Sequence, residues 1–304
     1  MSLATNTKRD WERTFVSWSQ PPSKTQEEKC KRAIDAVKAA IAKSSKLTAL
    51  GATVHIQGSF RNRTTVREDS DVDTCILYSG TQLVEYPRSI SLNDVGLAPA
   101  AYLYEAYKGD VGTALVAHFG AANVKRGNKA FDIHENTYRV DADAVACFEY
   151  RNYFFDTHGV LRFHVGTALI TDREKRTVSN FPEQQYANGV AKHEATAKRF
   201  KKVVRILKCL RNEMDEHKIA AAAPISSYLI ESLAWNVADL RFAGASLHEV
   251  VRAVLLDIWA ATNKPETCAM WLEENAIKFL FHPTQKWKRE QVNAFALAAW
   301  TYCK

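Results

Sequence analysis

Residues 57–77, QGSFRNRTTVREDSDVDTCIL, carry the features that decide the fold. They open with a Gly-Ser pair, Gly58 and Ser59, and close with two aspartates, Asp71 and Asp73, at the start of an apolar run. The Gly-Ser pair follows one alternating segment, ATVHIQ, and the aspartates begin a second, DVDTCILY. Alternation rich in β-branched residues is typical of strands. The stretch therefore predicts two strands joined by a polar connection.

The two aspartates suit a metal site. Side chains on a strand alternate between its faces, so Asp71 and Asp73 point the same way. Two carboxylates side by side repel each other unless cations lie between them. Hard divalent ions such as Mg²⁺ take oxygen ligands and complete their shells with substrate phosphates. We therefore expect two Mg²⁺ ions, for which Mn²⁺ can substitute, with a third carboxylate supplied by a neighbouring strand.

The segment YRVDADAV offers that third carboxylate twice, because Asp141 and Asp143 also share a strand face. Asp143 is followed by the apolar AVACF, so it lies deeper along the strand. We therefore favour Asp143 as the third catalytic and metal-binding aspartate, with Asp141 as the alternative.

The residues around the Gly-Ser pair suit a phosphate. Gly58, at the end of a strand, lets the backbone approach a phosphate closely, and a following helical turn would offer N–H groups and the Ser59 hydroxyl. Arg61 and Arg63 lie in the same connection and could also meet phosphates, although arginines are common in loops. Alone, each feature is typical of a simple turn or an exposed strand; their spacing favours a nucleotide-binding catalytic site.

The rest of the chain predicts an α+β protein in two parts. Strands and helices are expected to mix in residues 1–185, and helices alone in residues 186–304, with the active site in a cleft between these parts. Helices are expected over residues 24–43, about 98–119, 187–216, from Pro224 onward, and near 246–262, 266–280 and 287–303, and further strands over 130–134, 138–149 and 160–165.

Composition limits the function only broadly. The 304 residues include 41 basic and 34 acidic side chains, a net charge of +7 that is compatible with a polyanionic ligand. The six cysteines lack zinc-ligand spacing and favour a reducing compartment. No stretch approaches 18 apolar residues, and the N-terminal segment has no apolar core of a signal peptide, so we expect a cytoplasmic protein without membrane association.

The same stretch resembles the G-S…D-x-D signature of the DNA polymerase β-like nucleotidyltransferases. The run R-N-R-T-T-V-x-x-D-S-D-V-D is more narrowly similar to the bacterial cGAS/DncV-like nucleotidyltransferases (CD-NTases), which make cyclic oligonucleotide signals. YRVDADAVACFEY resembles their third-aspartate strand, and residues 180–214 and 224–237 resemble two of their C-terminal helices. The resemblance spans roughly residues 50–240. It implies a polymerase β-like core, with a mixed sheet and helices, and a helical lobe that closes the active-site cleft.

The resemblance also implies nucleotide-binding residues in the helical part. Lys208 matches a lysine that contacts the donor triphosphate, Ser227 a serine that touches the same phosphates, and Tyr228 an aromatic residue that stacks on a base. Lysine is a strong phosphate partner and tyrosine can stack on any base. The alternatives are that Lys208 lies on the solvated face of a basic amphipathic helix, that Ser227 belongs to a helix start, and that Tyr228 packs in the core.

The function implied by the resemblance is the joining of ribonucleoside triphosphates, ATP and GTP among them, into a cyclic di- or trinucleotide with release of pyrophosphate. It further implies a monomer active in antiphage signalling, with a separate effector that senses the product. The histidine–cysteine zinc insertion with which the animal cyclic GMP-AMP synthase grips double-stranded DNA has no counterpart here, so activation by DNA is not supported.

Two other kinds of function stay open. The chain could be a linear-oligonucleotide, RNA-tailing or antibiotic nucleotidyltransferase, although its basic C-terminal part argues against a cationic drug as substrate. It could also be a catalytically inactive nucleotide-binding module, although all the acidic positions are filled.

Overall fold

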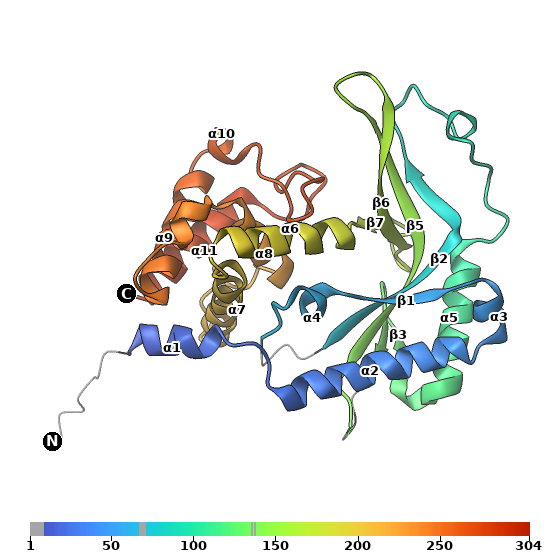
Figure 1. Ribbon diagram of the computed structural model, residues 1–304, viewed down its shortest axis with the longest axis horizontal. Coiled ribbons are helices and arrows are strands. Elements are labelled where there is room, and N and C mark those ends of the chain that lie inside the picture. The colour runs from blue at the N-terminus through green and yellow to red at the C-terminus, as the bar shows by residue number, and fades with distance from the viewer. Residues whose placement is uncertain (1–8, 67–70, 135, 137) are drawn as a thin grey trace. The chain divides into compact units, whose positions relative to one another are not determined.

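The computed structural model describes residues 9–66, 71–134, 136 and 138–304, which fall into two compact units (Figure 1). The sheet unit comprises Pro22–Asn62 and the described part of Arg67–Glu183. The helical unit comprises the described part of Met1–Pro21, together with Arg63–Val66 and Gln184–Lys304. Each unit has a hydrophobic core of its own.

In the described residues of the sheet unit, seven strands form one mixed sheet in the order β1-β2-β5-β4-β3, with β6 pairing to β5 and β7 to β6. β2 and β5 run parallel, and the other neighbouring strands run antiparallel. The strands are β1 (Thr53–Gln57), β2 (Val72–Glu85), β3 (Val124–Arg126), β4 (Phe131–Ile133), β5 (Ala142–Phe155), β6 (Leu161–Ile170) and β7 (Thr177–Asn180). The predicted mixed sheet is therefore confirmed.

Helices cover one face of this sheet (Figure 1). The helices on this face are α2 (Lys24–Ala42), α3 (Ser45–Ala49) and α5 (Tyr104–Phe119), whereas α4 (Gly58–Asn62) begins beside Asp73. Val37 of α2 and Tyr107 of α5 pack in one core with Ile76 of β2, and the Tyr107 hydroxyl donates to the Ile76 carbonyl at 2.9 Å. Because strand side chains alternate, Asp73 on β2 and Asp143 on β5 lie on the opposite face of the sheet.

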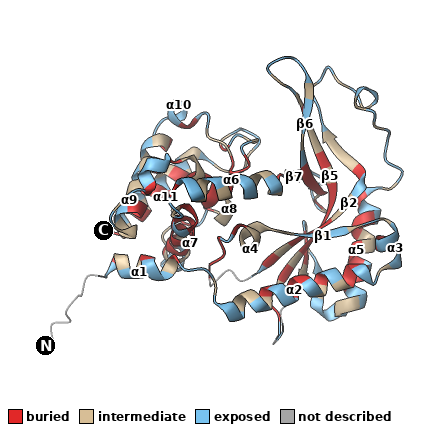
Figure 2. Ribbon diagram, in the orientation of Figure 1, coloured by how far each residue is buried: buried red, intermediate tan, exposed pale blue. Residues whose placement is uncertain are grey.

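The helical unit has a core that includes the N-terminal helix. Its helices are α1 (Trp11–Trp18), α6 (Pro182–Ala195, from Gln184 on), α7 (Phe200–Glu216), α8 (Ser227–Asn236), α9 (Leu247–Thr262), α10 (Pro265–Cys268) and α11 (Arg289–Tyr302). Buried residues are concentrated on α7 (Figure 2). None of the helices in the described residues combines the length and apolarity that a membrane crossing requires.

The division between the units differs from the one drawn at residue 185 of the sequence. Trp11 and Phe15 of α1 pack in the apolar core of the C-terminal helices, and Phe15 is fully buried there. Arg63–Val66 also belongs to this unit, although it lies in the chain between two elements of the sheet unit. Both groupings follow from long-range packing, which a change in strand and helix signals along the chain does not reveal.

The single long helix predicted over residues 187–216 is wrong, because the structure has two helices, α6 and α7, in its place. Ala197 and Lys198 adopt positive φ angles of 49° and 61°, which a helix does not tolerate. The Thr196 hydroxyl accepts a hydrogen bond from the backbone N–H of Phe200, the first residue of α7.

The helix predicted over residues 266–280 is also wrong, because α10 ends at Cys268. Beyond it the buried polar residues Glu274 and Asn275 hold an irregular segment. The Asn275 side-chain oxygen accepts hydrogen bonds from the backbone N–H groups of Ile277 and Lys278, at 2.8 and 3.1 Å. Such side-chain to backbone bonds compete with helix formation.

Candidate active site

Four side chains form a row across the sheet face that α2 and α5 leave open. In the strand register, Asp73 of β2 is the partner of Gln57 on β1 and of Asp143 on β5, and Asp143 is also the partner of Asp132 on β4. Partners in register lie on the same face of a sheet, about 5 Å apart. Three carboxylates therefore stand side by side at the level of Asp73.

Asp71 and Asp141 lie two residues before Asp73 and Asp143, directly ahead of the first residues of β2 and β5. The Asp141 carbonyl accepts the hydrogen bond of the Val72 N–H at 3.2 Å, so the two strands already pair there. Asp143 is therefore the residue beside Asp73, whereas Asp141 lies level with the exposed Asp71. The choice of Asp143 over Asp141 as metal ligand stays a prediction, and this register favours it.

The row of carboxylates perturbs Asp143. Burial raises the pKa of Asp143, and the charges of Asp132, Asp71 and Asp141 raise it further, to about 6. Each of these effects disfavours the ionised carboxyl, and a bound cation would oppose both.

Gly58 provides room for one of these carboxylates. Its φ angle is +69°, and a Cβ added there would lie 1.9 Å from Asp73 Oδ2 and 2.7 Å from Asp73 Cγ. No side chain larger than hydrogen fits unless Asp73 moves. Gly58 is the first residue of α4, and Ser59 follows it in the first turn. The Gly-Ser pair and the second aspartate of the D-x-D motif are therefore in direct contact.

The carboxylates fit a hard divalent cation. Their donor atoms are all oxygens, as Mg²⁺ and Mn²⁺ prefer, and burial together with the neighbouring carboxylate charges raises the pKa of Asp143. Within the described residues, no three Asp, Glu, His or Cys side chains are already gathered closely enough to hold a metal ion. Like charges stay apart when no cation lies between them, so a bound ion would have to draw these carboxylates together.

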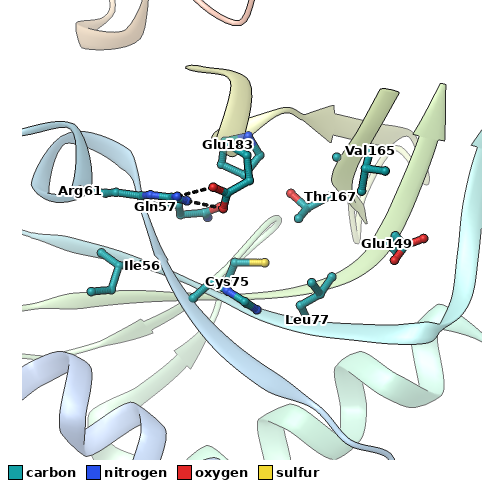
Figure 3. A pocket seen from close by; sticks show the side chains of 12 residues that line it. Ile56, Gln57, Arg61, Cys75, Leu77, Glu149, Val165, Thr167 and Glu183 are labelled. Atoms are coloured by element: carbon teal, nitrogen blue, oxygen red, sulfur yellow. Dashed lines mark hydrogen bonds and ion pairs between the residues drawn. The ribbon is translucent and has the colours of Figure 1, made fainter. Parts of the chain in front are cut away.

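A pocket opens on the same sheet face (Figure 3). It has a volume of about 200 Å³ and is lined by residues of β1, β2, β5 and β6 and by the adjoining ends of α4 and α6. Every second residue of a strand lies on the same face. Cys75 and Leu77 of β2 therefore share the face of Asp73, and Glu149 of β5 shares the face of Asp143, so these lining residues continue the face that carries the aspartates.

Two polar groups distinguish this pocket. Arg61 lies at its edge and donates from both terminal nitrogens to the Glu183 carboxylate, at 2.8 and 2.5 Å (Figure 3). The Thr167 side chain is 7% exposed, and its hydroxyl lies beside the Cys147 thiol with no stronger hydrogen-bond partner among the described residues. Because a thiol is a weak hydrogen-bond partner, this buried hydroxyl is suited to a polar ligand at the pocket wall.

The residues predicted in the helical unit have partners within that unit. Lys208 is buried and forms an ion pair with Glu231 at 2.6 Å. Ser227 is the first residue of α8, and its hydroxyl accepts a hydrogen bond from Arg211 at 2.9 Å. Their contacts with a triphosphate stay predictions.

Tyr228 and Arg63 also have partners within the helical unit. The Tyr228 hydroxyl donates to Glu273 at 2.8 Å, and its ring packs against Trp287 at a centroid distance of 5.7 Å. Arg63 has an exposed side chain and a φ angle of 57°, and its carbonyl accepts a hydrogen bond from Arg205. Base stacking by Tyr228 and a phosphate contact by Arg63 stay predictions.

Sequence reasoning gave no role to Asp132 or Glu231. Asp132 is the one charged residue of the short strand FDI, and only the pairing of β4 with β5 places it beside Asp143. Glu231 is the one charged residue in the apolar helix SYLIESLAW, a pattern that by itself indicates a buried ion pair. That pattern could have been read from the sequence.

Comparison with known proteins gives a consistent result. Residues 187–304 match the model of the cGAS/DncV-like nucleotidyltransferase C-terminal helical domain. The chain is 42% identical over 295 residues to a cyclic dipyrimidine nucleotide synthase, CdnE, of Legionella pneumophila, with 96% of this chain and 98% of the relative covered. It is 32% identical to a synthase of the same name from Cecembia lonarensis, with 95% and 96% covered.

Solved structures are similar over the same length. The CdnE c-UMP-AMP synthase of Rhodothermus marinus, solved with Apcpp and Upnpp, superimposes with a TM-score of 0.80. The sequence identity is 27%, and the match covers 96% of each chain. The polymerase β-like fold that the D-x-D signature implied is confirmed by this likeness.

We expect Gly58→Ala to weaken Mn²⁺ binding by about 10- to 100-fold, the scale on which displaced neighbours of metal ligands act. The added methyl group would displace the Asp73 carboxylate. Gly51→Ala is the matched control, because Gly51 has a φ angle of +68° and open space around the added Cβ. Both variants carry the same backbone strain of about 1–2 kcal/mol. Equal Mn²⁺ affinities of the two variants, measured by electron paramagnetic resonance of free Mn²⁺, would disprove the contact.

The pKa of Asp143 provides a second test, made by carboxyl-carbon NMR on metal-free protein. We expect a midpoint of about 6, against an ordinary value of 3.8. Because the folded state holds this proton more tightly, the free energy of unfolding should decrease as the pH rises from about 4 to about 6. Mg²⁺ should lower the midpoint, and so should Asp132→Asn, which removes a neighbouring charge. A midpoint near 4 in the metal-free protein would contradict the described crowding of carboxylates.

Proposed function

The chain belongs to the cGAS/DncV-like nucleotidyltransferases, and from this we propose that it joins two pyrimidine ribonucleoside triphosphates into a cyclic dinucleotide. The observation that carries the catalytic part is the register of Asp73 with Asp143 on the open sheet face beside Gly58. The pyrimidine bases are proposed from the names of the Legionella and Cecembia relatives. UTP and CTP thereby replace ATP and GTP, which the family resemblance alone suggested.

We propose that Asp71, Asp73 and Asp143 hold two Mg²⁺ ions, with Mn²⁺ as a substitute. Bound Mg²⁺ supplies positive charge to the triphosphate and favours the ionised form of a coordinated hydroxyl. The chain's own contribution is to fix the three carboxylates on one face and to keep a glycine where Asp73 needs space.

The reaction forms one bond and breaks one in each round. A ribose hydroxyl oxygen of one nucleotide attacks the α-phosphorus of the other, and the bond from that phosphorus to the bridging oxygen of the β-phosphate breaks. The hydroxyl proton is lost and pyrophosphate leaves. A second round, with donor and acceptor exchanged, closes the ring. Positioning and charge neutralisation supply most of the acceleration in reactions of this kind.

The pocket beside the aspartates supports a single-ring base. A protein cavity of about 150 Å³ takes up benzene, so about 200 Å³ is sufficient for one six-membered ring with its polar substituents. The Glu149 carboxylate can accept from the N3–H of uracil or the 4-amino group of cytosine, and the Thr167 hydroxyl can donate to a ring nitrogen or carbonyl. We propose that this pocket receives one of the two bases.

The proposal is tested by incubating the protein with UTP, CTP, ATP and GTP, each labelled in turn, with Mg²⁺ or Mn²⁺. We expect a phosphatase-resistant product that requires UTP or CTP and no purine triphosphate. Phosphatase-sensitive products would instead indicate a linear-oligonucleotide or RNA-tailing enzyme. Nucleotide binding without release of pyrophosphate would indicate an inactive binding module.

Single substitutions test the catalytic residues in the same assay. Asp71→Ala, Asp73→Ala and Asp143→Ala should each reduce turnover at least about 100-fold, the scale of losing one strong electrostatic contact. Asp141→Ala should have a smaller effect if Asp143 is the third ligand. Asp35→Ala, at an exposed position of α2, controls for the loss of an aspartate elsewhere in the sheet unit. Turnover near that of the unmodified protein in Asp73→Ala would refute the assignment.

Thr167→Val tests the pocket, because it removes the hydroxyl and keeps the shape of the side chain. We expect it to raise the KM for one pyrimidine triphosphate by about two- to tenfold, the worth of one neutral hydrogen bond. Thr177→Val, at an exposed position of β7, is the matched control. An unchanged KM for both nucleotides in Thr167→Val would exclude a base contact at this hydroxyl.

A further inference from the structure

Arg211 and Ser227 join two helices of the helical unit. Arg211 lies on α7, and Ser227 is the first residue of α8. A terminal nitrogen of the Arg211 guanidinium, Nη2, donates to the Ser227 hydroxyl oxygen at 2.9 Å. Both residues are half-buried, so neither is sealed from solvent. The pair is therefore a defined contact between α7 and α8 that a ligand can still approach.

This contact sets the direction of the Ser227 hydroxyl proton. A serine hydroxyl has one O–H donor and two acceptor lone pairs, whereas a guanidinium has donors only. Arg211 therefore occupies a lone pair of the Ser227 oxygen, and the hydroxyl proton must point away from Arg211. In the described part of the chain no other hydrogen bond engages this hydroxyl. Its proton is thus available to an acceptor on a ligand.

The charge of Arg211 is not balanced by a neighbouring acid. Arg9 and Arg241 of the same unit each form an ion pair with a carboxylate. Among residues 9–66, 71–134, 136 and 138–304, no carboxylate forms an ion pair with Arg211, and its buried Nε has no hydrogen-bond acceptor. Charged groups withdrawn from water are ordinarily paired. The guanidinium therefore leaves a local excess of positive charge beside the Ser227 hydroxyl.

A hydroxyl donor beside an unbalanced guanidinium suits an anion, and phosphate oxygens are strong acceptors for both groups. The anions that the proposed function supplies are triphosphates. We propose that Arg211 is a positioning residue for triphosphate binding, which turns the Ser227 hydroxyl toward a phosphate oxygen and keeps positive charge beside it. The identity of the anion rests on the proposed function, whereas the bond between Arg211 and Ser227 does not.

The alternative is that the bond only fastens α8 to α7. In that case the loss of Arg211 would lower the free energy of unfolding, and any variant that still folds would bind anions as before. Action through Ser227 has a different consequence. Loss of either residue removes the same oriented donor, so the two losses should not add in a double variant.

The first test is binding of the Mg²⁺ complex of inorganic tripolyphosphate, measured by isothermal titration calorimetry. We expect Arg211→Met and Ser227→Ala each to weaken binding about 10- to 100-fold, the worth of one hydrogen bond to a charged group. Arg211→Met/Ser227→Ala should lie within about threefold of the weaker single variant. Arg211→Lys, which keeps the charge and a donor, should recover most of the affinity. Arg241→Met, which removes an exposed arginine of the same unit, is the matched control.

Two results would overturn the proposal. One is unchanged affinity in Arg211→Met when its circular dichroism matches that of the unmodified protein. The other is a loss in the double variant equal to the product of the two single losses. If Arg211→Met does not fold, Arg211→Gln takes its place, because it keeps a donor for Ser227 and removes the charge. It should lose about three- to tenfold in affinity, and full affinity would count against the proposal.

The second test is kinetic and separates this proposal from the proposed function. We expect Arg211→Met to raise the KM for the triphosphates at least about tenfold with kcat within about threefold, the pattern of a lost binding contact. If product forms and the KM is unchanged, the proposal for Arg211 fails alone. If the unmodified protein binds tripolyphosphate but forms no product, the proposed function fails, and the calorimetry still decides on Arg211. An unmodified protein that binds no tripolyphosphate would overturn the proposal for Arg211.

Discussion

The repulsion between carboxylates on neighbouring strands is the constraint on which the candidate site depends. Parallel pairing of β2 with β5 fixes Asp73 beside Asp143, and antiparallel pairing of β4 adds Asp132 on the other side. Strand spacing is set by backbone hydrogen bonds, so the side chains cannot escape one another by a shift of the strands. The fold therefore maintains a concentration of negative charge that divalent cations can balance.

The position of Gly58 follows from the same constraint. Asp73 needs space on the open face of the sheet, and the chain leaves β1 by a turn that passes beneath its carboxylate. Any Cβ would occupy the place of that carboxylate, and the positive φ angle independently favours glycine. The glycine of the Gly-Ser motif is thus explained by its packing against Asp73, which we propose as a metal ligand.

Much of the sheet unit could be predicted because its signals are local. Alternation in ATVHIQ and DVDTCILY predicted β1 and the start of β2. The proximity of Asp132 could not be predicted, since it depends on which strand pairs with β5 and in which register. Such pairings are long-range properties that no window of sequence contains.

The basic face of α7 was harder to interpret for a physical reason. Helical spacing shows that Lys201, Arg205 and Lys208 share one side, and a charged stripe is ordinarily solvated. All three are buried, whereas Lys202 is exposed. The buried side is stable because acceptors arrive from distant parts of the chain, such as the Thr64 carbonyl. A sequence pattern identifies an amphipathic helix, and the location of its partners decides which side is buried.

The helical unit buries a second acid, Glu274, close to Glu231. Glu231 and Glu274 are both buried, and their pKa values shift in opposite directions. Glu231 stays ionised beside Lys208, whereas burial and the charge of Glu231 raise the pKa of Glu274 well above its ordinary value. Gln185 donates to both side chains, at 3.3 and 3.2 Å, and so bridges them. The two buried acids therefore depend on one another as well as on Lys208, because the charge of Glu231 is among the causes of the raised pKa of Glu274.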